Sequence, residues 1–184
     1  ATYSGDANYL TSTSSCTANP ATLDVKKATA PISVATSPGT ITIGDSFNAT
    51  ATLTAPPGTP PAYTGNITFS VYGPGDTTCT GALVTTADVP VTPAGTAVSP
   101  AFSPSAPGTY RVIATYGPNP NFTKVDTVCD AAGTTVDVTQ AVPTVTTTFS
   151  PTTIAYGDTA ALSTTLTGPA TVAAPTREVT FIIY

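Results

Sequence analysis

The chain has 184 residues, of which only 8% are charged, and its five Lys and Arg against ten Asp and Glu give a net charge of −5. Nucleic acids are bound by clusters of basic residues, and here only Lys26 and Lys27 are adjacent. A bilayer is spanned by an apolar run of roughly 20 residues, and the sequence has no run of that length. The sequence therefore argues against nucleic-acid binding and against a membrane-spanning segment. The 19 Pro and 14 Gly interrupt helices, whereas the many Thr and Val favour strands. We therefore expect an all-β fold.

An internal repeat runs through the chain. Ala1-Thr2-Tyr3 recurs as Ala114-Thr115-Tyr116, an offset of 113 residues, so the chain holds about 1.6 copies of one unit. The same offset relates Asn8 to Asn121, Cys16 to Cys129, Asp24-Val25 to Asp137-Val138, Ser37-Pro38 to Ser150-Pro151, Gly44-Asp45 to Gly157-Asp158 and Leu53 to Leu166.

Pro-rich joints divide the chain into three parts. We expect residues 1–28 to be the C-terminal strands of a preceding copy, residues 29–140 to be a complete copy, and residues 141–184 to be the N-terminal strands of a following copy. The joints, at residues 27–31 and 140–143, have the composition of short, stiff linkers.

About seven strands are expected in the complete copy, because apolar and polar residues alternate between Pro- and Gly-rich turns, as in antiparallel sandwiches. In chain order they are expected at residues 32–37, 47–53, 66–72, 79–86, 96–102, 110–116 and 136–138. In the following copy, the residues expected to face the core are Leu162, Leu166, Val179, Phe181 and Ile183.

The segments Gly108–Tyr116 and Ala1–Tyr9, together with Ser37-Pro38, Gly44-Asp45 and Gly65–Phe69, resemble the bacterial Ig-like repeats of the group 3 type. The resemblance covers nearly the whole chain. It departs from the family at residues 117–122, where a Ser-Gly-Asp motif is lost, and in carrying two cysteines per repeat. It implies tandem immunoglobulin-like β-sandwiches at a cell surface or in secreted protein, and it implies no activity.

The repeat also organises the three cysteines. Each copy should hold one cysteine at the position of Cys79 and one at the position of Cys129, which predicts a Cys79–Cys129 disulfide, with Cys16 paired to a cysteine outside this segment. Free buried thiols are the alternative, and a metal site is disfavoured because the chain has no His and no C-x-x-C motif. A disulfide implies an oxidising, extracellular setting.

Candidate residues for catalysis and metal binding are few. The chain has no His and a single Glu, Glu178, so we expect no enzyme, no catalytic residue and no cofactor. Calcium held by Asp6, Asn8 and Asp24 near a joint is the more serious alternative. Because Asn119-Pro-Asn121 replaces the acid in the next copy, turn formation is the preferred interpretation, and no metal site is predicted.

Candidate sites of modification are more numerous. Asn48-Ala-Thr50, Asn66-Ile-Thr68 and Asn121-Phe-Thr123 match the N-glycosylation pattern, so Asn48, Asn66 and Asn121 are candidate acceptors. O-linked glycans on the many Thr and Ser residues are equally compatible with the composition.

Sandwiches joined by short linkers predict a structural role. We expect a repeat of an extracellular surface fibre, stalk, filament or sheath, acting as a rigid spacer with one disulfide per unit. Its partners would be neighbouring Ig-like repeats of the same or adjacent chains, and a homopolymer is compatible with this role. The alternative is an adhesin module that binds a glycan or a protein through loops at one end of the sandwich. Exposed Tyr63, Tyr72 and Phe122 could form such a patch, although scattered surface aromatics are ordinary.

Overall fold

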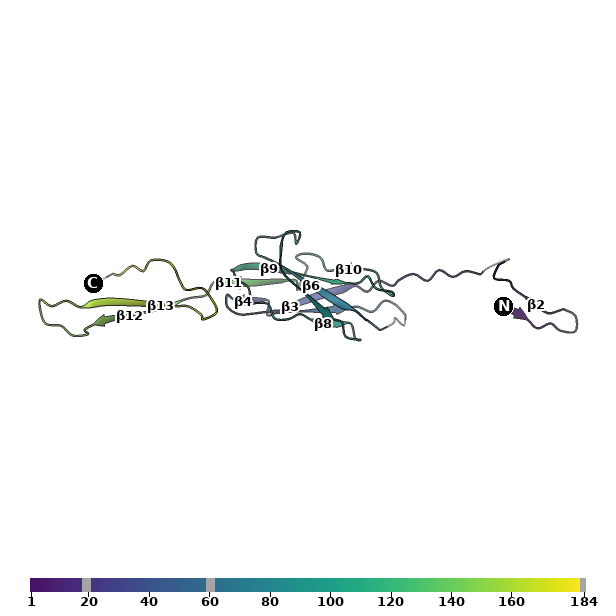
Figure 1. Ribbon diagram of the computed structural model, residues 1–184, viewed down its shortest axis with the longest axis horizontal. Coiled ribbons are helices and arrows are strands. Elements are labelled where there is room, and N and C mark those ends of the chain that lie inside the picture. Colours follow the sequence, from purple (N-terminus) through teal and green to yellow (C-terminus); the bar gives the residue numbers. More distant parts are fainter. Residues whose placement is uncertain (18–20, 59–61, 183–184) are drawn as a thin grey trace.

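The computed structural model describes residues 1–17, 21–58 and 62–182, and this part of the chain is built from β-strands. A central sandwich lies between two shorter hairpin segments, one toward each end of the chain (Figure 1). Within the described residues, no helix is long and apolar enough to cross a membrane. The expectation of an all-β fold is confirmed.

Two sheets face each other in the central sandwich. The larger sheet has the strand order β4-β11-β9-β6-β7, with β10 pairing the end of β9, and the smaller sheet has the order β3-β5-β8. Neighbouring strands are antiparallel except β4 and β11, which are parallel. The bounds are β3 (Ile32–Ser37), β4 (Thr40–Thr42), β5 (Asn48–Leu53), β6 (Asn66–Tyr72), β7 (Leu83–Pro90), β8 (Thr96–Val98), β9 (Gly108–Tyr116), β10 (Val125–Asp126) and β11 (Thr135–Thr139).

The core lies between these sheets and is filled by alternate residues of their strands. Along β9, Tyr110, Val112, Ala114 and Tyr116 are all at most 2% exposed, as the alternation predicts. Burying one large apolar side chain stabilises the folded state by roughly 1.5–3 kcal/mol, so the buried side chains of this strand together contribute several times that amount to the free energy of folding. The other fully buried large side chains include Phe47, Ile67, Phe69 and Val136.

Two strand predictions in the central sandwich are wrong in their bounds. The strand expected at residues 79–86 begins at Leu83, because Cys79 has a φ of 55° and belongs to a loop rather than to extended backbone. The strand expected at residues 96–102 ends at Val98, and Phe102 makes only an isolated bridge to Phe47. The short strands β4 and β10 were not expected, because two or three residues are too few to show a period.

The following hairpin, formed by β12 (Thr144–Ser150) and β13 (Ala161–Thr167), pairs in the same register as β3 and β5. Val145 lies opposite Leu166, and Ile32 lies opposite Leu53. Each residue of the first pair lies one repeat offset after its counterpart in the second pair. Leu162 and Leu166 are half-buried on one side of β13, in agreement with their predicted inward direction.

The prediction that Val179 and Phe181 face a core is wrong, since these side chains are 38% and 47% exposed and lie in irregular backbone after β13. Their counterparts on β6, Ile67 and Phe69, are buried because the smaller sheet packs over that face of β6, and no second sheet faces the segment around Phe181 in the described part of the chain. Ile183 lies outside the described residues.

The preceding hairpin, formed by β1 (Thr2–Tyr3) and β2 (Ser12–Thr13), also repeats a register of the central sandwich. Tyr3 lies opposite Ser12, and Tyr116 lies opposite Val125. Tyr116 and Val125 again lie one repeat offset after Tyr3 and Ser12.

Candidate functional site

The disulfide joins two loops that connect strands of the larger sheet. The sulfurs of Cys79 and Cys129 are bonded, with their Cα atoms 5.9 Å apart, as the repeat predicts. Cys79 lies in the connection between β6 and β7, and Cys129 lies in the segment between β10 and β11. Cys16 is an exposed free thiol.

Arg111 of β9 holds the same two loops together, and sequence reasoning missed this role. Its side chain is 8% exposed, and its Nε donates to Asp130 Oδ1 at 2.7 Å. Its Nη1 also donates to the backbone carbonyl of Asp76 at 3.3 Å. One cation therefore binds both loops beside the disulfide. The signal available in the sequence was a lone Arg inside an apolar strand.

Asp76 organises the loop between β6 and β7 from within. Its carboxylate accepts hydrogen bonds from the backbone N–H of Gly81 at 2.8 Å and of Thr78 at 3.0 Å. These bonds, that from Gly81 foremost, lower the pKa of Asp76 below its ordinary value. The carboxylate thus stabilises the turn by accepting backbone hydrogen bonds, as Asp commonly does.

The acidic residue considered for calcium is engaged in its own turn. Asp6 Oδ1 accepts from the backbone N–H of Asn8 at 2.8 Å and of Tyr9 at 3.0 Å, and Asp6 Oδ2 accepts from the Tyr3 hydroxyl at 2.6 Å. The hydrogen bond from Tyr3 is the largest cause that lowers the pKa of Asp6. Asp24 lies instead 3.8 Å from the ammonium of Lys26.

In the central sandwich, Asn119 makes the same turn as Asp6. Asn119 Oδ1 accepts from the backbone N–H of Asn121 at 3.0 Å and of Phe122 at 2.8 Å. This equivalence matches the preferred turn interpretation. Over residues 1–17, 21–58 and 62–182, no three His, Cys, Asp or Glu side chains form a group that could hold a metal ion.

The expectation that Tyr63 and Phe122 are exposed is wrong. They are 7% and 1% exposed, and their rings stack with centroids 5.2 Å apart beside Tyr116. Burial, followed by the proximity of Tyr116, raises the pKa of Tyr63, whose hydroxyl has no hydrogen-bond partner among the described residues. Tyr72 is half-buried. The proposed aromatic surface patch therefore does not form, because the connections at this end of the sandwich fold inward over the core.

The three candidate glycosylation sites lie in different surroundings. Asn48 is half-buried on β5, and its Nδ2 donates to the carbonyl of Ser99 at 2.9 Å. Asn66, at the start of β6, and Asn121, in the connection between β9 and β10, are exposed. A glycan on Asn48 would disturb an existing hydrogen bond, whereas Asn66 and Asn121 are accessible in the folded chain.

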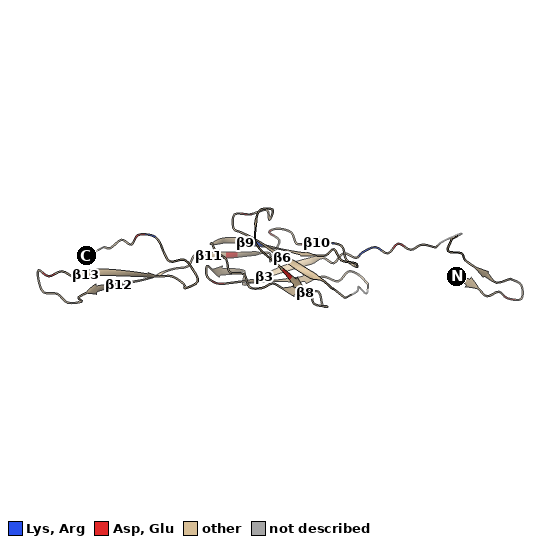
Figure 2. Ribbon diagram, viewed as in Figure 1, with Lys and Arg blue, Asp and Glu red and all other residues tan. Residues whose placement is uncertain are grey.

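Charge is distributed unevenly over the two sheets. The strands of the smaller sheet, all of them fully described, carry no charged residue, whereas the larger sheet carries Asp88 on β7, Arg111 on β9, Asp126 on β10 and Asp137 on β11 (Figure 2). Several of these carboxylates accept hydrogen bonds from threonines of the neighbouring strand, as Asp137 does from Thr109 at 2.7 Å.

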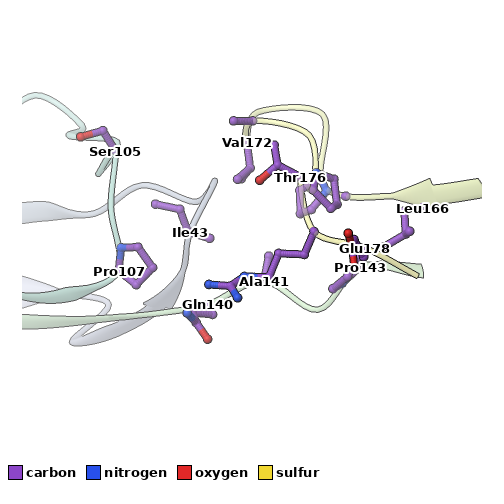
Figure 3. A pocket seen from close by; sticks show the side chains of 15 residues that line it. Ile43, Ser105, Pro107, Gln140, Ala141, Pro143, Leu166, Val172, Thr176 and Glu178 are labelled. Carbon is purple, nitrogen blue, oxygen red and sulfur yellow. The ribbon is translucent and has the colours of Figure 1, made fainter. Parts of the chain in front are cut away.

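A cavity of about 490 Å³ lies between the central sandwich and the segment that follows it (Figure 3). Ile43, Pro107 and Gln140 line it from the sandwich, and Leu166, Val172 and Glu178 line it from the following segment. Its walls are mainly apolar, and Arg177 and Glu178 are the charged residues among those that line it.

No family model matches the chain, and no curated protein matches it.

Proposed function

We propose that residues 29–140 are one immunoglobulin-like repeat of a tandem array, and that the array is a rigid spacer in an extracellular fibre, stalk, filament or sheath. The observation that carries this proposal is the repeat offset. Residues one offset apart have matching amino acids, and they also pair in the same register between neighbouring strands. Equal registers on both sides of the central sandwich are what repeated units of one fold require.

Turn geometry supports the tandem arrangement. The backbone N–H of Asp45 donates to the carbonyl of Thr42 at 3.0 Å, and that of Asp158 donates to the carbonyl of Ala155 at 3.1 Å. Gly44 and Gly157, which precede these acids, have φ values of 106° and 97°. The same turn thus precedes the second long strand of both copies.

Exposed side chains of the preceding segment support it as well. Leu23 and Val25 are 87% and 83% exposed, whereas their counterparts Val136 and Val138 on β11 are 0% and 4% exposed. The apolar side chains of residues 1–28 therefore occupy positions that are core positions in the complete unit.

The immunoglobulin-like assignment rests on strand order and on one tyrosine. Consecutive strands are divided between two sheets, and β4 lies parallel to β11 at the edge of the larger one. The hydroxyl of Tyr110, near the start of β9, donates to the carbonyl of Ala106 at 3.1 Å. A tyrosine at this corner, bonded to backbone a few residues upstream, is a hallmark of immunoglobulin-like sandwiches.

An extracellular location is supported by the disulfide, because such bonds persist in oxidising compartments. The acids described above stabilise turns and loops, and we propose no catalytic role for any of them. A unit of this kind contributes length and stiffness to a longer assembly.

Tandem chains of one to four copies of residues 29–141 test the spacer function. We expect the maximum particle dimension from small-angle X-ray scattering to grow linearly, by about 40 Å per copy, from strands at roughly 3.3 Å per residue plus a joint. A dimension that grows only weakly with copy number would contradict a spacer. Binding of the single copy to a glycan array, lost when the loops at one end are substituted, would favour the adhesin alternative.

A further inference from the structure

We propose that the turn formed by Gly44 and Asp45 is a docking site for residues 171–172 of the following unit, so that neighbouring units are held at a fixed angle. This inference rests on the proposed spacer function and names the surface that would make the spacer stiff. The docking contact lies at the joint shown in Figure 3.

The turn is held firmly by the end of the central sandwich. The backbone N–H of Ile43 donates to the carbonyl of Thr139 at 2.9 Å, which attaches the turn to the end of β11. Asp45 closes the turn, since its Oδ2 accepts from the N–H of Thr42 at 3.3 Å. The turn is therefore a fixed feature of the sandwich surface.

The following unit contacts this turn directly. The Thr171 hydroxyl donates to the carbonyl of Gly44 at 3.2 Å. Val172 is half-buried and packs against the core of the central sandwich, although it belongs to the following segment. Figure 3 places Val172 and Ile43 on facing sides of the joint.

Gly44 is required at this contact for two separate reasons. Its φ of 106° lies in the region that side chains rarely adopt, and a Cβ there would lie 2.6 Å from Thr171 Oγ1 and 3.0 Å from Val172 Cγ2. A side chain at Gly44 would therefore strain the turn and also displace the Thr171 and Val172 side chains that make the contact.

Gly157 provides a matched control within the same chain. It occupies the same turn in the next copy with a φ of 97°, but no described atom lies within 4 Å of a Cβ built on it. Substituting Gly157 strains an equivalent turn without touching a neighbouring unit. The difference between the two substitutions therefore isolates the docking contact.

Proline residues restrict the remaining motion at the joint. Pro107 on the sandwich side, Pro143 in the linker, and Pro169 and Pro175 in the following unit all line the cavity. Only Pro143 lies in the connection between β11 and β12, and its fixed φ removes one free backbone torsion from that connection. The contacts of Thr171 and Val172 add to this restriction by holding the following unit against the turn.

The test is ¹⁵N relaxation of the 184-residue chain, comparing β3–β11 with β12–β13. We expect the wild type and Gly157→Ala to show one rotational diffusion tensor for both groups of strands. We expect Gly44→Ala to lose this common tumbling, with faster motion of β12–β13. Val172→Asp, which leaves the central sequence unchanged, should cause the same loss by placing a charge against apolar side chains.

Urea unfolding of the central sandwich serves as the folding control for all variants. Independent tumbling of the two parts in the wild type, or equal behaviour of Gly44→Ala and Gly157→Ala, would overturn the docking proposal. Such a result is distinguishable from failure of the spacer function, because the length of tandem chains is measured separately.

Discussion

Among single residues, Arg111 stands out for the polar contacts that it makes inside the fold. It projects from a strand whose neighbouring positions are buried and apolar, and it donates to Asp130 and to two backbone carbonyls, those of Asp76 and Thr109. A buried guanidinium must be paired, because desolvating an unpaired charge is costly. Arg111 therefore requires the two loops to stay where the disulfide places them.

We predict that Arg111→Met lowers the free energy of unfolding by about 2 kcal/mol, the typical worth of hydrogen bonds to a charged group. Asp130 is half exposed and remains hydrated, which keeps the loss moderate. Urea unfolding followed by tyrosine fluorescence measures the change. Lys27→Met, at an exposed linker position, is the control and should leave the transition unchanged within about 0.5 kcal/mol. Equal effects of the two substitutions would contradict the assigned role.

At the scale of elements, the most unusual feature is the interruption between β10 and β11. Both strands pair with β9, and the residues between them carry Cys129 and Asp130, which has a φ of 60°. The segment stays attached to β9 at both ends, since Thr127 Oγ1 accepts from the N–H of Ala114 at 2.9 Å and the carbonyl of Thr134 accepts from the N–H of Val112 at 2.8 Å. The interruption thus presents Cys129 to Cys79 without breaking the sheet.

We predict that replacing both Cys79 and Cys129 by Ala lowers the free energy of unfolding by about 4 kcal/mol, the chain-entropy value for a loop of this size. The two cysteines are separated by 50 residues, so the bond greatly restricts the unfolded chain. Thermal and urea unfolding with and without a reducing agent measure the effect. Cys16→Ser, which alters an exposed thiol, should behave like the wild type. A double variant as stable as the wild type would contradict the prediction.

At the scale of the whole molecule, the central sandwich contains nearly all of the buried apolar surface. The buried hydrophobic residues run from Ala30 to Val138, and the following segment adds the half-buried Ala141 and Val172. Even the linker belongs to the sandwich at its start, because Ala28 pairs with Asn121 and Thr123 through backbone hydrogen bonds of 2.9 Å each.

We predict that residues 28–141, produced alone, fold cooperatively and unfold at the same urea concentration as the 184-residue chain. The physical reason is that the excised piece retains the whole core and the disulfide. Circular dichroism and urea titration of both chains provide the comparison. An excised piece that is unfolded, or that unfolds at a much lower urea concentration, would show that the flanking segments are part of the same cooperative unit.

The fold was largely predictable where the alternation of apolar and polar residues along a strand indicates which side chains are buried. Alternation placed Tyr110, Val112, Ala114 and Tyr116 on one face of a strand, and the structure buries all four. The pairing of Cys79 with Cys129 followed from the repeat. The burial of Tyr63 and Phe122 was not predictable, because these residues lie in connections whose course depends on contacts with distant strands.

The amino-acid sequence by itself determined the all-β character, the inward face of the long strands and the repeat offset, because alternation and repetition are local properties of a chain. The tertiary structure alone decided that Arg111 joins two loops, that Asp76 and Asp6 serve turns, and that Gly44 meets Thr171 of the following segment. These contacts connect residues far apart in the chain or depend on the detailed course of a loop. Their geometry exists only once the sheets are packed.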